Sequence, residues 1–510
     1  MKNLTWWKRY LMVVSVTACA VLASRPWQVR SAEPAAQDQE ANKYFGSQIC
    51  SDCHKPDPTR PDRYKESKFF IRFDESVIWR EDDKHSQAYD NLTTERGRRM
   101  GDLLHVADVT KEAGCLGCHS ASVQELNNRF NKAETFNLKE GVSCENCHGP
   151  YSGWAVPHLE SSFRTRSYDD WNAKGFVDLR TPKGKAEKCL SCHIGNVDER
   201  KVVTHEMYAA GHPPLPSIEV ATFANAIPRH WWLNSERDPE KAKEIKKSLG
   251  YEEGQLEQTK LAIVGAAVAL KTSLKLLADE TKPLNRAPAP GESWPDYARF
   301  DCWSCHHDLK RDGWRQARGY NDGPPGRVPV SEWPLTLVEL GIDHLDQNDP
   351  AVKSLRLNFA KYEKALHEQA NVRPFGQKAS IAKAADDLAG CADELIKKLG
   401  ASKFDKDVAL KLLRNLVEKA EKSTPDYDSA RHVGWTIKLL VDDIGFVGLN
   451  RPKIDPIIAK LDSGLKLTLP AGRAFNIEDQ IGKALETIGD YDPATFKAQL
   501  GELLALLPPG

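Results

Sequence analysis

The sequence predicts a mainly α-helical protein, and two observations lead to this fold class. First, apolar residues recur at helical spacing through the C-terminal part, where Asp349-Pro350 supplies an N-cap and a first-turn proline and Gly400 a stop signal. Second, residues 257–277 have the pattern of one helix, whose small apolar middle suits a buried scaffold better than a partner-binding face. The C-terminal helices are expected near residues 351–370, 380–399, 406–421, 427–445, 476–488 and 493–506.

The N-terminus has the charge and order of a signal peptide. Lys2, Lys8 and Arg9 precede the apolar run Leu11–Ala23, and no acidic residue occurs before Glu33. A transmembrane helix needs about 20 apolar residues, so this run is short for a retained anchor, which is the alternative. We therefore expect residues 1–23 to be removed on export and residues 24–47 to form a flexible tether.

The cleavage site has a second interpretation. Val16-Thr17-Ala18-Cys19 resembles a bacterial lipobox, in which Cys19 would carry a lipid anchor. Cleavage after Val21-Leu22-Ala23 is preferred because the lipobox leaves a short apolar region. Either site places the mature protein in the periplasm or another extracytoplasmic space, and the lipobox would add membrane association. No later segment of membrane-spanning length is free of charge, so no internal span is expected.

Overall charge excludes one class of partner. The formal net charge is −1 at pH 7, and no basic run stands out, so nothing suggests a nucleic-acid binder.

The spacing of the cysteines decides the class of chemistry. Ten of the 12 cysteines form five Cys-x-x-Cys pairs, and a histidine follows each pair directly. Two thiols at this spacing can form thioethers with the two vinyl groups of a porphyrin, and the next side chain can bind the iron as proximal ligand. The five motifs are Cys50/Cys53/His54, Cys115/Cys118/His119, Cys144/Cys147/His148, Cys189/Cys192/His193 and Cys302/Cys305/His306.

Other uses of these cysteines fit less well. Structural disulfides are common in exported proteins, but they do not require this spacing. A zinc site would explain paired cysteines, yet it gives no reason for an adjacent histidine five times over. Cys391 lies on an apolar helix face and is expected to be a buried core thiol. The sequence therefore predicts five covalently bound haem c groups, with iron as the metal.

Electron-carrying haems are commonly held by two protein ligands, so further histidines are expected on the distal side of each iron. His205 and His212 are seven residues apart, which would place them on one helix face. His158 follows the third motif on a loop that could fold back over a haem. His307 cannot bind the iron of its own motif but could reach a neighbouring haem. The distal candidates are His85, His158, His205, His212 and His307, with His432 in reserve.

Four histidines are expected to be surface or core residues rather than ligands. They are His105, His230, His344 and His367, among which His230, beside Trp231 and Trp232, is the best further candidate.

Three segments resemble one group of multihaem cytochromes c, which includes the tetrahaem cytochrome that accepts electrons from hydroxylamine oxidoreductase. They are Gly141-Val142-Ser143-Cys144-Glu145-Asn146-Cys147-His148-Gly149-Pro150, Lys84-His85-Ser86-Gln87-Ala88 and Ala210-Gly211-His212-Pro213. The resemblance covers roughly residues 45–225. It implies a mainly helical fold with few strands and closely paired haems, and it supports His85, His158 and His212 as distal ligands.

The chain departs from that group after residue 225. It has a fifth motif, a long connection over residues 226–300 and a helical C-terminal region. We expect a pentahaem cytochrome domain over residues 48–320, a linker rich in proline and glycine over 321–348 and a helical domain over 349–510.

These observations favour an exported electron carrier whose partners are other redox proteins. The first alternative is an oxidoreductase that acts on a small nitrogen or sulfur compound at one five-coordinate haem. All five motifs end in histidine, so the lysine-ligated active haem of pentahaem nitrite reductases is absent. A second alternative is a subunit that docks a haem protein onto a complex through the C-terminal helices.

Overall fold

The computed structural model describes most of the chain after residue 42. The described residues are 43–59, 71–121, 131–132, 135–160, 162–163, 166–233, 254–282, 293–306, 328, 330–331, 333–372, 375–422, 426–446, 448–467 and 491–509. The expected signal peptide, most of the tether, Cys19 and His307 lie outside these residues.

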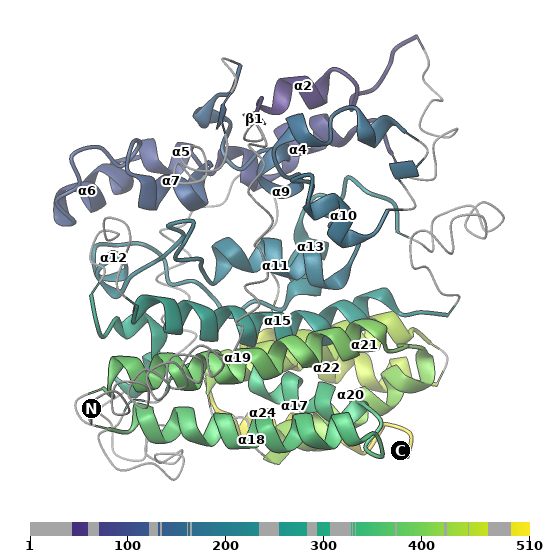
Figure 1. The fold of residues 1–510 in the computed structure, drawn as a ribbon. Helices are drawn as coiled ribbons and strands as arrows, with labels where there is room; N and C mark the ends of the chain where they lie inside the picture. The colour runs from purple at the N-terminus through teal and green to yellow at the C-terminus, as the bar shows by residue number, and fades with distance from the viewer. Residues whose placement is uncertain are drawn as a thin grey trace, which may run out of the picture. The chain divides into compact units, whose positions relative to one another are not determined.

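The described part of the chain is mainly helical, which confirms the predicted fold class (Figure 1). Its strands are the two-residue segments β1 (Lys43–Tyr44) and β2 (Asn131–Lys132), which pair in parallel. Tight 3-10 turns are frequent: η1 (Lys84–Gln87), η2 (Leu138–Glu140), η3 (Tyr151–Gly153), η4 (Pro157–Leu159), η7 (Tyr297–Arg299) and η8 (Cys302–Ser304).

Short helices alternate with loops up to residue 226. These helices are α2 (Ser47–Ser51), α4 (Glu75–Asp82), α5 (Asp90–Thr93), α6 (Glu95–Leu103), α7 (Ala113–His119), α9 (Cys144–His148), α10 (Tyr168–Asn172), α11 (Pro182–His193), α12 (His205–Ala209) and α13 (Val220–Ala226). Their apolar clusters are small, for example Tyr89, Leu92, Val109 and Leu116. This region therefore has little side-chain core of its own.

Longer helices form the rest of the described structure. They are α15 (Glu257–Glu280), α17 (Leu335–His344), α18 (Pro350–Ala370), α19 (Lys378–Ala401), α20 (Lys406–Lys422), α21 (Tyr427–Ile444), α22 (Arg451–Leu465) and α24 (Pro493–Leu504). The predicted helices near 351–370, 380–399, 406–421, 427–445 and 493–506 are confirmed as α18, α19, α20, α21 and α24. The helix expected near 476–488 lies outside the described residues.

Helix α15 joins the two regions. It packs along α11 on one side and along α19 and α17 on the other (Figure 1). Its length and composition would allow it to cross a membrane, with a mean hydropathy of 1.7, but 78% of that stretch is buried inside the protein. Because neighbouring helices cover it, α15 is a core helix, as the small apolar residues of its middle predict.

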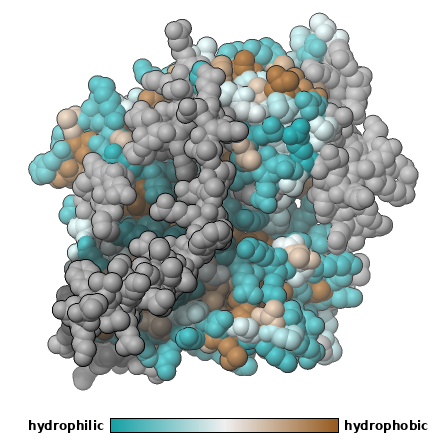
Figure 2. Space-filling view, viewed as in Figure 1, coloured by the Kyte–Doolittle hydropathy of each residue, from teal (hydrophilic) through white to brown (hydrophobic). Residues whose placement is uncertain are grey.

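One hydrophobic core extends from the fourth motif into the C-terminal helices. It includes Ala186 and Leu190 of α11, most of α15 and residues as distant as Leu503 of α24. Cys391 is buried within it, as expected. Polar residues cover most of the described part of the surface visible in Figure 2, and apolar residues form scattered patches there.

Two features of the C-terminal region differ from the sequence analysis. Helix α17 lies inside the segment predicted as a linker, and its Leu337, Val338 and Leu340 are completely buried. Helix α22 was not predicted because Pro456 interrupts its pattern, although Arg451-Pro452 places another proline in its first turn.

Candidate functional site

A large cavity lies among the short helices of the N-terminal region and reaches α15. Its volume is about 1980 Å³, whereas a pocket for a small organic ligand has roughly 300–1,000 Å³. Residues of four of the five motifs line it, together with His85, His158, His212 and His230. The side chains that a covalent cofactor needs therefore surround a space that the protein's own side chains leave empty.

Short helices carry the motifs at the cavity wall. Helices α7, α9 and α11 each end at the motif histidine: His119, His148 and His193. In α9 the residues between the cysteines serve the fold, because Asn146 forms a capping box with Ser143.

The first motif differs from this pattern at its second thiol. We expected Cys50 and Cys53 to attach one haem together, but only Cys50 and His54 line the cavity, and Cys53 is exposed. The physical reason is local: α2 ends at Ser51, inside the motif, so Cys53 lies in the turn that follows the helix. In the second, third and fourth motifs the helix continues through the second cysteine to the histidine. Cys53 therefore lies on the exposed side of the first motif, as Cys302 and Cys305 do in the fifth.

Gly149, directly after His148, has a φ of 88° and lies against the Gly175 carbonyl, where a Cβ atom would come within 1.8 Å of the oxygen. The backbone N–H of Val177 donates to the His148 carbonyl at 2.9 Å, which fixes the two segments together. Only glycine permits this close approach.

Three motif histidines face a second histidine from a distant part of the chain. Each pair has its ring centroids 6.3 or 6.4 Å apart. The pairs are His193 with His85 at 6.4 Å, His119 with His212 at 6.3 Å and His306 with His205 at 6.3 Å. The ring planes are nearly perpendicular in the first two pairs, at 84° and 83°, and inclined by 34° in the third.

For the other two motif histidines, His148 and His54, electrostatic effects connect the motif with a second histidine. Burial, together with the charges of His230, His54 and Lys188, lowers the pKa of His148 to about 4. Burial likewise lowers the pKa of His158, and the charge of His54 adds to that effect. The charges of His230 and His54 therefore both act on His148, and the charge of His54 acts on His158.

Hydrogen bonds hold several of these rings in one orientation. The Nδ1 atoms of His119, His158 and His212 donate to the carbonyl oxygens of Ala88, Ala155 and Pro213 at 2.7, 2.5 and 2.7 Å. His85 Nδ1 donates to Asp83 Oδ1 at 2.9 Å, and His54 Nδ1 lies 3.5 Å from Glu75 Oε2. A ring that donates through Nδ1 presents its Nε2 lone pair, which is the arrangement found in metal-binding histidines.

Protonation also favours metal binding. Burial lowers the pKa of His119, of His193 and of His212, the last to about 4. These imidazoles are therefore neutral near pH 7, and neutral imidazole is the form that binds a metal ion.

The motif thiols of different helices meet in pairs. The thiol of Cys144 lies within hydrogen-bonding reach of Cys50, and this contact together with burial raises the pKa of Cys144. Cys118 has the same relation with Cys192. The first motif therefore lies beside the third, and the second beside the fourth.

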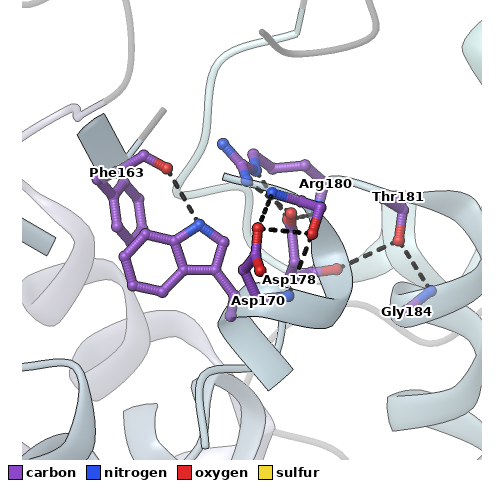
Figure 3. Close-up of polar contacts among 8 residues, drawn as sticks. Phe163, Asp170, Asp178, Arg180, Thr181 and Gly184 are labelled. Atoms are coloured by element: carbon purple, nitrogen blue, oxygen red, sulfur yellow. Dashed lines mark hydrogen bonds and ion pairs between the residues drawn. The ribbon is translucent and has the colours of Figure 1, made fainter. Parts of the chain in front are cut away.

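A loop between the third and fourth motifs contributes Phe163, Asp178, Arg180 and Thr181 to the cavity wall. Its polar contacts are shown in Figure 3. Trp171 Nε1 donates to the Phe163 carbonyl at 3.0 Å, and the guanidinium of Arg180 forms an ion pair with Asp178 at 2.6 Å. Thr181 caps α11 by accepting from the Gly184 N–H at 3.0 Å. Positively charged side chains that could pair with the propionates of a haem also line the cavity: Lys84, Arg96, Arg180, Lys183, Lys185, Lys188, Lys201 and Arg229.

Comparisons with known proteins agree with this geometry. Residues 49–149, which contain the first three motifs, match the family described as cytochrome c554 and c-prime. The chain is also 22% identical over 184 residues to cytochrome c-554 of Nitrosomonas europaea, which covers 35% of this chain and 67% of the relative. The chain is a multihaem cytochrome c that resembles cytochrome c-554. This match supports covalently bound haem c and a role in electron transfer.

No solved structure matches the chain. The fifth motif and the C-terminal helices of this cytochrome lie outside the matched residues 49–149.

The fifth motif of this cytochrome lies apart from the residues that line the cavity. Cys302 and Cys305 are exposed, and His306 faces His205 of α12. The His205 backbone N–H donates to Asp296 Oδ1 at 3.0 Å, which ties α12 to the segment before the motif. His212, seven residues further along the chain, faces the second motif. The two histidines do not share one helix face, as we had expected, because α12 ends at Ala209.

The two reserve histidines, His432 and His230, lie in different surroundings. His432 is buried against Trp333, with ring centroids 4.7 Å apart, and burial lowers its pKa to about 3. It does not line the cavity of this cytochrome, whereas His230, which we grouped with the surface and core residues, does. The neighbouring Trp231 and Trp232, which also line the cavity, were the only sequence signal that pointed to His230.

Proposed function

We propose that this protein is an exported pentahaem cytochrome c that transfers electrons between redox partner proteins. In this proposal each Cys-x-x-Cys-His motif binds one haem c through two thioethers and a proximal histidine. Every haem also has a distal histidine. The proposed proximal–distal pairs are His54–His158, His119–His212, His148–His230, His193–His85 and His306–His205.

The separation of the paired imidazoles carries this proposal. Two imidazoles that bind one metal atom from opposite sides, each through a nitrogen–metal bond of about 2.0 Å, hold their centroids roughly 6.3 Å apart, since a ring nitrogen lies ~1.15 Å from the centroid. The three measured separations are 6.3 or 6.4 Å. At all three sites the partner of the motif histidine is another histidine from a distant part of the chain.

The protein residues would tune and connect the haems rather than react. A bound haem supplies one-electron exchange at its iron, with a potential set by its ligands, burial and nearby charge. At the second motif, the neutral and largely buried imidazoles of His119 and His212 would help to exclude water and dioxygen. The thiol contacts support a chain of sites in which the first motif neighbours the third and the second neighbours the fourth.

The fifth haem would extend this chain at its exposed end. α12 and the turn after it carry both His205 and His212, so one short segment would ligate the second and fifth haems. Exposure of Cys302 and Cys305 suits a haem that exchanges electrons with a partner. The signal-like residues 1–23 support export, and the helices after residue 349 would form the scaffold that carries the haem region.

Single histidine variants of the holoprotein test the ligand set. Replacing His85, His158, His205, His212 or His230 by alanine should convert one haem from low spin to high spin, as measured by electron paramagnetic resonance of the oxidised protein. His105→Ala is the matched control, because His105 is exposed and does not line the cavity. An unchanged low-spin signal in His85→Ala, His205→Ala and His212→Ala would refute the proposal.

A further inference from the structure

Asp83 is a buried carboxylate at the wall of the haem cavity. Only 5% of its surface is exposed, and it lies between α4 and η1. Its Oδ1 accepts from the backbone N–H of His85 at 3.0 Å and from the ring Nδ1 of the same residue at 2.9 Å. Two hydrogen bonds to one residue fix both the backbone and the ring of His85.

This contact differs from those of the other candidate ligands. Among the described residues, His119, His158 and His212 donate their Nδ1 proton to neutral backbone carbonyls. The nearest comparison is His54, whose Nδ1 lies 3.5 Å from Glu75, beyond the usual hydrogen-bond distance. His85 is therefore the ligand whose imidazole has a carboxylate acceptor at normal hydrogen-bond distance.

The carboxylate carries a fixed negative charge. An aspartate carboxylate is ionised near pH 7, and the two N–H groups of His85 that donate to Asp83 favour this charged form.

We propose that Asp83 sets the potential of the haem bound by His193 and His85 and makes it the lowest among the haems of the cavity. This inference rests on the ligand pairs of the proposed function. A carboxylate that accepts the Nδ1 proton makes the imidazole a stronger donor to the oxidised iron. Its negative charge, in an environment of low dielectric constant, also favours the oxidised state, which carries one positive charge more than the reduced state.

Asp83→Asn removes the charge and keeps the geometry. The amide oxygen introduced by this substitution could still accept from the His85 ring, and asparagine caps a helix start as well as aspartate does. The spectroelectrochemical titration of the variant should show one low-spin haem with a reduction equilibrium at least tenfold more favourable, a rise of about 59 mV for one electron. The count of low-spin haems should not change.

Two control variants isolate the role of the charge. Glu81→Gln removes the same charge from an exposed residue that does not line the cavity, and it should leave all potentials within threefold of the original equilibrium. Asp83→Glu keeps the charge and should shift the same haem less than Asp83→Asn does. An equal shift in Asp83→Glu and Asp83→Asn would overturn the inference, because displacement of the ring rather than loss of charge would then be the cause.

His85→Ala separates this inference from the proposed function. If His85→Ala produces a high-spin haem while Asp83→Asn leaves every potential unchanged, His85 is a ligand and Asp83 does not tune its haem. If His85→Ala leaves all haems low-spin, the ligand assignment itself is wrong, and the inference about Asp83 falls with it. Loss of a low-spin signal in Asp83→Asn would also overturn the inference, since Asp83 would then be needed to keep His85 bound.

Discussion

Replacing Gly149 by alanine should destabilise the protein strongly, because two separate costs add at this residue. A left-handed backbone costs a residue with a Cβ atom roughly 1–2 kcal/mol, and Gly149 has a φ of 88°. The added Cβ would also lie 1.8 Å from the Gly175 carbonyl oxygen, where an ordinary contact is 3.4 Å or more, so the backbone at Gly175 must move by 1.6 Å or more. Phe176, the next residue, stacks on His148 and would have to move with it.

We therefore expect Gly149→Ala to lower the free energy of unfolding by at least about 3 kcal/mol, the size of a substantial core defect. Thermal and urea unfolding of the holoprotein, followed by far-ultraviolet circular dichroism, measure this loss. Gly390→Ala is the matched control. Gly390 is an exposed residue of α19, and an added Cβ atom would meet no other atom within 4 Å, so alanine should stabilise that helix by about 0.5–1 kcal/mol. A Gly149→Ala protein within about 0.5 kcal/mol of the original would refute this reasoning.

Three further results are expected. His205→Ala should make the exposed fifth haem high-spin while the haem count, measured as the pyridine haemochrome, stays the same; a loss of several low-spin signals at once would contradict an isolated fifth site. The ring planes are inclined by 34° in the pair His306–His205 and by 83° in the pair His119–His212. Ligand planes closer to parallel split the iron d orbitals more, so the electron paramagnetic resonance signal of the first haem should be more rhombic than that of the second. Glu145→Gln should destabilise the protein by about 1–3 kcal/mol, because the buried carboxylate accepts three backbone N–H groups at 2.6–2.8 Å and the new amide nitrogen would face one of these donors. A melting temperature equal to that of the exposed control Glu81→Gln would count against this role.

Local signals predicted much of the fold and of the haem attachment. The Cys-x-x-Cys-His spacing is a property of a few consecutive residues, so it could be recognised without any knowledge of the fold. The helices after residue 349 repeat apolar residues at helical spacing, and α18, α19, α20 and α21 begin and end within two residues of the expected positions. Helix α22 was missed because Pro456 breaks the local pattern, while burial of Ile454 and Leu461 keeps the helix in place.

Pairing of the histidines could not be derived from the sequence alone. His85 and His193 are more than 100 residues apart, and only the fold decides which motif each distal candidate faces. His230 shows the same difficulty, because nothing in its local sequence distinguishes a cavity histidine from a surface one except two neighbouring tryptophans. Exposure of Cys53 is likewise invisible in the motif, since it depends on where α2 ends. Helix α17 is a related case, since a segment rich in proline and glycine surrounds a short apolar helix that only burial makes stable.

The central claim is that two histidines hold each of five covalent haems. Its most direct test is quantitative electron paramagnetic resonance of the oxidised protein, with the total haem measured independently by the pyridine haemochrome. The account predicts five haems per chain, all low-spin. A stoichiometric high-spin signal, or fewer than five haems in protein made by a host competent in cytochrome c maturation, would contradict it.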